Sequence, residues 1–226
     1  MATNYDSNFS FHEQLWYYYT ANRGKIRSRY NDLTRKFLAY NDSEENPHAF
    51  LRRPQFEALE MYVFVKEFMG NPQVYQMFDD WRNKRGNFSD ASYYSLSKSG
   101  QITIFDAPTE KITDTLFKQM KKYREAYPNY IYALTMGLGK TILMATCIFY
   151  EFLLAKKYPK DKRYCQNALV FAPDKTVLDS LHEIMTFDKT KVVPPEYASV
   201  LDSNIKFHFL EDTGTTLHTI DDSKFN

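Results

Sequence analysis

The second half of the chain alternates short apolar runs with longer stretches of helical length. Segments of strand length lie at 130–134, 168–172 and 205–210, and 168–172 is a continuous apolar run. Stretches whose pattern predicts helices separate them, at 140–157 and 174–185. Continuous apolar runs are typical of strands buried on both faces, and alternation of strands with helices predicts a parallel sheet with right-handed crossovers. The pattern therefore predicts an α/β fold for this half.

The first half has a different pattern, in which helical spacing dominates. Aromatic and basic residues crowd 9–40, and the polar stretch 41–47 has the composition of a loop. A helix is predicted to begin near Pro54, because proline is accepted in a first helical turn, and to end before Gly70. Further along, a short strand is expected near 101–105 and an amphipathic helix over 113–127. The sequence thus predicts a mostly helical region ahead of the α/β pattern.

Composition narrows the classes of function. The chain has 226 residues, enough for one large domain, and a formal net charge of +1, so any nucleic-acid surface must be a local patch. Its two cysteines and five histidines show no metal-ligand or catalytic spacing, and Cys147 is expected to be a buried thiol. No apolar run approaches the ~18 residues of a membrane span, and the N-terminus lacks a signal pattern. We therefore expect a cytoplasmic protein with no membrane partner.

The segment between the apolar run 130–134 and the next predicted helix has the composition of a phosphate-binding turn. Its backbone N–H groups can converge on one point at a helix N-terminus, and its glycines admit close approach of phosphates. The lysine can reach the β- and γ-phosphates and the threonine hydroxyl can ligate Mg²⁺. The full P-loop pattern has a further glycine where this chain has Leu134, so a ligand-free turn remains the alternative. The segment consists of Met136, Gly137, Leu138, Gly139, Lys140 and Thr141.

Three segments, in this order, resemble the first motor domain of superfamily 2 helicases and translocases. Residues 51–58, Leu-Arg-Arg-Pro-Gln-Phe-Glu-Ala, are similar to the adenine-reading segment, and the resemblance assigns Gln55 and Arg52 to the adenine. Residues 136–141 match the Met-Gly-Leu-Gly-Lys-Thr form of the phosphate-binding motif. The third segment follows the apolar run at 168–172 and resembles a loop that touches the nucleic-acid backbone, which assigns that role to Pro173, Lys175 and Thr176.

Within this superfamily the chain is most similar to DEAD/DEAH-box-type enzymes, such as the type III restriction enzyme helicase subunit and related bacterial defence helicases. The resemblance implies an incomplete P-loop (RecA-like) parallel sheet with flanking helices over 51–226, with an insert at about 71–112, after a helical extension over 1–50. It also implies ATP and Mg²⁺ as cofactors. The implied partners are nucleic acid, with DNA favoured over RNA, a second C-terminal motor domain, and methyltransferase or nuclease subunits.

The chain departs from that family in ways that bear on catalysis. The family uses a later Asp-Glu pair for Mg²⁺ and water, and no Asp-Glu dipeptide occurs here. Asp174 stands where the family has threonine beside the phosphate backbone. We therefore assign no catalytic residue and expect this chain, as the N-terminal portion of a motor, to bind nucleotide but hydrolyse it poorly. The alternative is a non-catalytic nucleotide- or partner-binding module that retains a relic P-loop.

Overall fold

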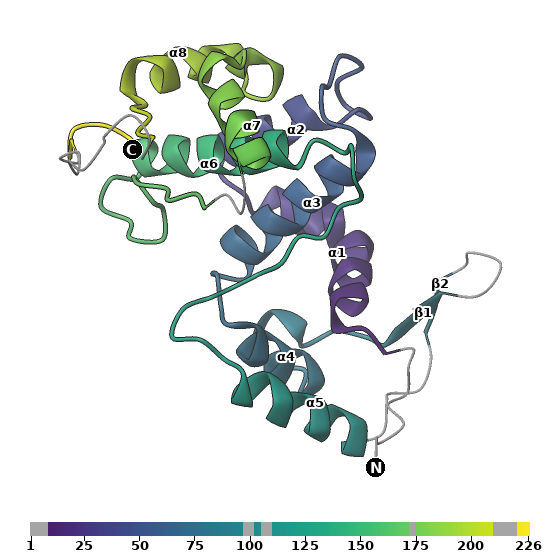
Figure 1. Ribbon diagram of the computed structural model, residues 1–226. Helices are drawn as coiled ribbons and strands as arrows, with labels where there is room; N and C mark the ends of the chain where they lie inside the picture. The colour runs from purple at the N-terminus through teal and green to yellow at the C-terminus, as the bar shows by residue number, and fades with distance from the viewer. Residues whose placement is uncertain (1–8, 97–101, 105–109, 172–174, 210–220) are drawn as a thin grey trace. The chain divides into compact units, whose positions relative to one another are not determined.

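The computed structural model of the chain describes residues 9–96, 102–104, 110–171, 175–209 and 221–226 (Figure 1). The chain divides into two compact units. Unit 1 contains residues 1–30 and 61–132, and unit 2 contains residues 31–60 and 133–226. The predicted N-terminal extension is therefore shared between them, since residues 31–50 belong to unit 2.

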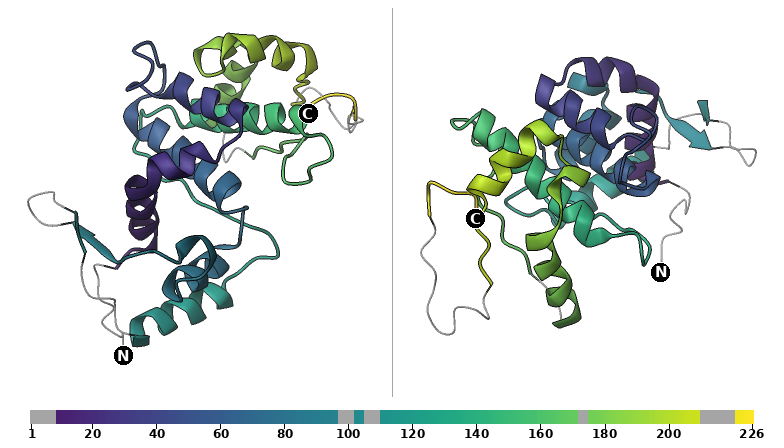
Figure 2. Two further views of the ribbon diagram at one scale, coloured as in Figure 1. Left: turned by 180° about the vertical axis from the view of Figure 1, so that it is seen from behind. Right: turned by 90° about the horizontal axis from the view of Figure 1, so that it is seen from above.

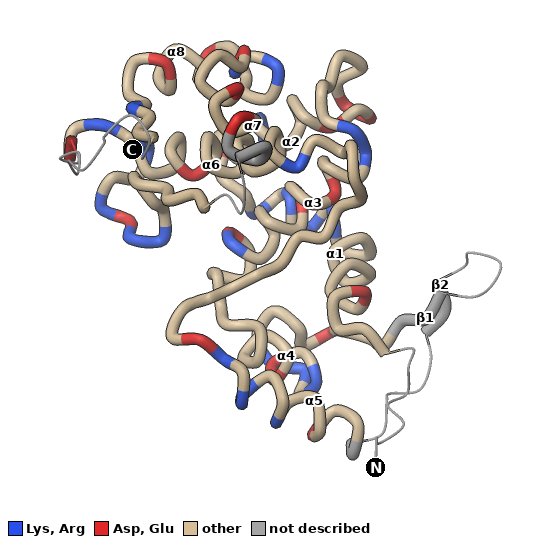
Figure 3. Tube along the Cα trace, viewed as in Figure 1, with Lys and Arg blue, Asp and Glu red and all other residues tan. Residues whose placement is uncertain are grey.

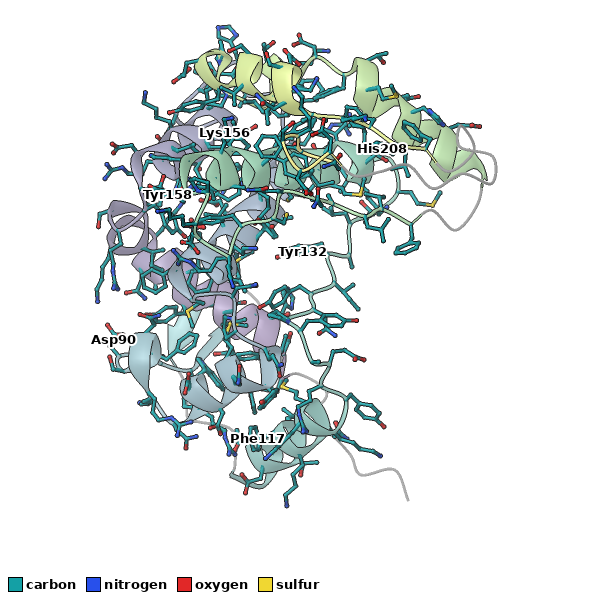
Figure 4. All side chains as sticks on the ribbon, turned by 90° about the vertical axis from the view of Figure 1, so that its left-hand side faces the viewer. Asp90, Phe117, Tyr132, Lys156, Tyr158 and His208 are labelled. Atoms are coloured by element: carbon teal, nitrogen blue, oxygen red, sulfur yellow. The ribbon has the colours of Figure 1, made fainter. Side chains whose placement is uncertain are left out.

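Unit 1 is built from helices and one strand pair. Its elements are α1 (Phe11–Ser28), the end of α3 (Arg53–Val63) with a π-helical continuation (Phe64–Phe68), α4 (Val74–Arg82), β1 (Tyr94–Leu96), β2 (Ile102–Ile104) and α5 (Glu110–Lys122). Helices α4 and α5 pack against each other (Figure 2, left). At their contact the Arg82 guanidinium lies 4.3 Å from the ring centroid of Phe117 (Figure 4). This cation–π contact joins the two helices, and the Arg82 guanidinium also pairs with Asp114 of α5.

The core of unit 1 is dominated by aromatic side chains. Phe11 meets Phe78 edge to face with ring centroids 4.9 Å apart, and Tyr18 meets Phe88 in the same way at 5.0 Å. Such pairs add about 0.5–1.5 kcal/mol each beyond the area they bury. The buried aromatic residues of this unit are Phe11, Tyr18, Tyr19, Tyr30, Phe64, Phe78, Trp81 and Phe88. The aromatic density of the N-terminal sequence is thus explained largely by packing.

Unit 2 is organised around one central helix, α6 (Lys140–Lys157). Helices α7 (Lys175–Thr186) and α8 (Pro195–Asn204) pack on it, and α2 (Asp32–Asn41) and the start of α3 complete the unit (Figure 1). A helix that is apolar on most of its faces is expected to be buried in this way. One polar contact fixes α2 to α6: the Thr34 and Tyr150 hydroxyls lie 2.8 Å apart in the core.

The predicted parallel, RecA-like sheet is wrong. Within the described residues the structure has no parallel sheet, and its paired strands are the antiparallel β1 and β2, in the register Ser95↔Thr103. Residues 130–134 and 168–171 are not strands, and of 205–209 only Ile205 forms a bridge, to Phe225. The fold is mostly helical.

The apolar runs fail to become strands because a strand needs neighbours for its backbone groups. A helix satisfies its own N–H and C=O groups, whereas a strand depends on a second strand beside it. In this chain Ile131, Leu169 and Phe171 are 95%, 81% and 85% exposed. Among the described residues, the second and third runs form a few backbone bonds to the C-terminal residues: the Ala168 N–H donates to Asn226 and the Lys206 N–H to Phe225. Short apolar runs do not by themselves distinguish a buried strand from an unpaired segment.

The predicted helices are confirmed, with small differences in their bounds. The helix predicted over 140–157 is confirmed as α6, and the one predicted over 174–185 is confirmed as α7, with Asp174 outside the described residues. The amphipathic helix predicted over 113–127 is α5, which begins three residues earlier and ends at Lys122. Of the short strand expected near 101–105, the described part is β2. Among the described helices, none combines the length and apolarity that a membrane crossing requires.

Candidate nucleotide-binding site

The two glycines of the turn before α6 adopt a left-handed backbone conformation. Gly137 has φ +76° and Gly139 has φ +63°, both in the left-handed region that disfavours side chains. Gly139 immediately precedes the 18-residue helix α6, and its carbonyl accepts the first helical bond from Leu143 at 3.1 Å. The first N–H groups of a helix have no carbonyl partner within it, and they carry the positive end of the helix dipole. The turn therefore leads directly to a set of N–H groups suited to an anion.

Lys140 and Thr141 open the helix at this point. The Lys140 side chain is exposed, and its ammonium donates to the Thr135 carbonyl at 3.0 Å, so the lysine lies against the segment that leads into the turn. Thr141 is half-buried in the first turn of α6. Both side chains thus lie at the start of the helix, where a phosphate group and its metal ion would need them.

The other residues assigned to the turn contribute through their backbone. Met136 is 94% exposed, and Leu138 is half-buried. Neither residue type offers a side-chain group that recognises phosphate. Leu138 contributes the N–H group between the two glycines, and Met136 precedes the first of them.

Gln55 is brought to the turn from 84 residues away in the sequence. Its side-chain amide Nε2 donates to the Gly139 carbonyl at 3.1 Å, and its Oε1 accepts from the Arg52 N–H at 2.9 Å. The residue is buried, with 4% of its surface exposed, whereas Arg52 is exposed. The structure therefore unites the two segments that the resemblance placed at one nucleotide, and it uses both polar atoms of Gln55 on main-chain groups.

The residues assigned to the nucleic-acid backbone are less fully described. Pro173 lies outside the described residues. Lys175 and Thr176 begin α7, which packs on α6, and their assignment stays a prediction.

A basic loop at the other end of α6 was missed as a candidate site. We use this name for residues 156–163, which carry the exposed residues Lys156, Lys157, Lys160, Lys162 and Arg163 (Figure 3). Asp161 is the acidic residue in this loop, and its carboxylate accepts from the Arg163 guanidinium at 2.6 Å and 3.0 Å. The sequence signal for this loop is five cations within eight residues.

Metal-binding side chains are scarce in the part of the chain that the structure describes. No group of three or more His, Cys, Asp or Glu side chains lies close enough together to hold a metal ion there. Magnesium usually keeps several waters and is held by one or two protein oxygens together with substrate phosphates, so the Thr141 hydroxyl suits that role only alongside a nucleotide.

Comparison with known proteins gives no independent guide to this site. No family model matches the chain, no curated protein matches it, and no solved structure matches its fold. The functional argument rests on the geometry of the chain itself and on its sequence motifs.

Proposed function

We propose that the turn from Gly137 to Thr141 binds the phosphates of ATP, and that the chain is the nucleotide-binding portion of an ATP-dependent DNA helicase or translocase. One observation carries the proposal. Two glycines in left-handed conformation lead directly into the N-terminus of α6, where Lys140 and Thr141 lie side by side in the sequence. The resemblance of three ordered segments adds the enzyme class, a restriction or phage-defence setting and a cytoplasmic location.

Each residue of the turn has a definite task in this proposal. The N–H groups at the start of α6 donate to phosphate oxygens, and the glycines keep Cβ atoms out of the way. Lys140 exchanges the Thr135 carbonyl for a phosphate, which strengthens its hydrogen bond because both partners are then charged. Thr141 would ligate Mg²⁺, which supplies further neutralisation of the phosphate charge.

Contact with nucleic acid is supported by the basic loop. Its exposed lysines can neutralise backbone phosphates whatever the base sequence, and the rings of Tyr158 and Tyr164 lie 6.0 Å apart beside them. Figure 4 labels Lys156 and Tyr158 at the end of α6. The preference for DNA over RNA comes from the resemblance alone.

Hydrolysis by this chain on its own is expected to be poor. The acidic pair that handles the attacking water in the resembling family has no Asp-Glu counterpart in this sequence. Binding of ATP, and not its turnover, is therefore the property to test first.

The test is the melting temperature of the chain with and without MgATP. ATP at about 100 times its dissociation constant should raise the free energy of unfolding by about 2.7 kcal/mol. For a protein of this size, the melting temperature then rises by roughly 5–10 °C. Lys140→Ala should abolish the rise. Lys156→Ala, an exposed lysine at the far end of the same helix, should leave it intact. A relic module without a working site would show no rise in the unaltered chain.

A further inference from the structure

The environment of Gln55 differs from what a base-reading residue needs. To read adenine, a glutamine side chain must present its amide oxygen and nitrogen to the base edge. Here the residue is 4% exposed, and both atoms already bond main-chain groups of this chain. A reading role would require the side chain to leave the interior and to break both hydrogen bonds.

The two bonds of Gln55 stabilise two helix starts at once. Gln55 is the third residue of α3, and its Oε1 accepts from the N–H of Arg52, the residue just before that helix. A glutamine at this position reaching back in this way is one half of a capping box. Its Nε2 donates to the carbonyl of Gly139, the residue just before α6. One buried amide thus connects the N-termini of α3 and α6.

The contact leaves little freedom at the turn. A Cβ placed on Gly139 would lie 2.9 Å from the Gln55 Nε2, whereas one placed on Gly137 would meet nothing within 4 Å. The Gly139 carbonyl also accepts the first helical bond of α6, from Leu143. Gln55 therefore holds the second glycine of the turn at the position from which the N–H groups of α6 are directed.

We propose that Gln55 is a positioning residue for the phosphate-binding turn and that the site recognises the polyphosphate of its ligand without reading the base. This inference rests on the proposed function, because it assigns the ligand class of the same turn. Its consequence is that ATP, GTP and inorganic tripolyphosphate bind with similar affinity, and that loss of the Gln55 contact weakens all three alike.

The experiment measures dissociation constants of MgATP, MgGTP and magnesium tripolyphosphate for the unaltered chain and for Gln55→Met. Methionine has a similar volume and no hydrogen-bonding amide. Loss of a neutral hydrogen bond is expected to weaken all three ligands on the order of 3- to 10-fold, with the ratio of ATP to tripolyphosphate affinity unchanged. Gln166→Met, at an exposed glutamine of the same unit, should change none of the three constants.

Each contrary outcome is distinct. A base-reading Gln55 would give weaker ATP binding in Gln55→Met with tripolyphosphate unaffected, and the unaltered chain would prefer ATP to GTP by more than tenfold. That preference alone overturns the proposal, even where Gln55→Met fails to fold. A purely structural Gln55 would lower the melting temperature but leave all three constants unchanged, which also overturns it. If the unaltered chain binds none of the three, the phosphate site itself is wrong and the inference is overturned with it.

Discussion

The two ends of α6 present positive charge in different ways. At the N-terminal end the charge is directional, because it comes from helix N–H groups, two glycines in fixed conformation and Lys140, with the buried Gln55 amide beneath the turn. At the C-terminal end it comes from five exposed cations on the basic loop, of which Arg163 is held by Asp161. The first arrangement suits one small anion in one geometry, and the second suits a long polyanion in many.

This difference has a physical consequence for how each end would respond to salt. Exposed charges act over a Debye length of about 8 Å at physiological ionic strength and release counterions from a polyanion, so their binding falls steeply as salt rises. Directed hydrogen bonds at a helix start depend more on local geometry. Mutations at each end of α6, and changes in ionic strength, should therefore distinguish the binding properties of the two ends.

The largest effect is expected from neutralising the basic loop. Replacing Lys156, Lys157, Lys160 and Lys162 together with glutamine should weaken DNA binding by tenfold or more and reduce the slope of log affinity against log salt by about 2–4. Titration of a labelled oligonucleotide at several salt concentrations measures both. MgATP affinity should stay unchanged, since the turn lies at the other end of the helix. If the unaltered chain and the four-lysine variant bound DNA with equal affinity, the basic loop would not take part in DNA binding.

The next largest effect is expected on stability, when each of the two glycines of the turn is replaced by alanine. Gly139→Ala should destabilise unit 2 by about 1–2 kcal/mol through its positive φ and also displace the Gln55 amide, whereas Gly137→Ala should cause the conformational strain alone. Urea unfolding of both variants provides the measurement. Equal loss of stability in the two would show that the Gln55 contact contributes nothing.

A smaller effect of opposite sign is expected from removing the acid in the basic loop. Asp161→Asn takes away the carboxylate that holds Arg163 and leaves every cation in place. DNA affinity should rise by a few-fold and the salt slope should steepen by about 1, because one more cation can meet a phosphate. Lower affinity for DNA would instead indicate that Asp161 is needed to shape the loop.

The smallest expected effect is a difference in thiol reactivity, and it concerns Cys147, midway along α6. Burial, with Glu151 adding to it, raises the pKa of the Cys147 thiol to about 12, so almost no thiolate is present at pH 8. Cys165 should therefore be alkylated by iodoacetamide well before Cys147 in the folded chain, and both should react in urea. Mass spectrometry of the labelled peptides reads this directly. Early labelling of Cys147 would contradict the raised pKa of its thiol.

The sequence predicted those parts of unit 2 whose hydrogen bonds are local. Helix α6 satisfies its own backbone, and its bounds could be read from Lys140 after the glycines and from the lysine pair 156–157 at its end. The apolar runs ending at Leu134 and beginning at Ala168 had the right composition for strands. Strands depend on neighbours that composition does not specify, and among the described residues neither run forms a strand.

In the candidate site, too, local features could be predicted from the sequence and contacts between distant segments could not. The glycine turn and its lysine were recognisable from six consecutive residues. The role of Gln55 at the start of α3 was also open to local reasoning, because glutamine at the third helical position often reaches back to the helix start. Its bond to Gly139 was not, since that contact joins residues 84 positions apart and depends on how α3 packs near α6.

The most direct test of the central claim is hydrogen exchange of the backbone amides from Gly137 to Leu143, with and without MgATP. We predict slower exchange at the amides of Gly139, Lys140 and Thr141 when ATP is present, because these N–H groups would then be bonded to phosphate, and no such change in Lys140→Ala. Unchanged exchange at these amides under saturating MgATP, or protection confined to another part of the chain, would contradict the account.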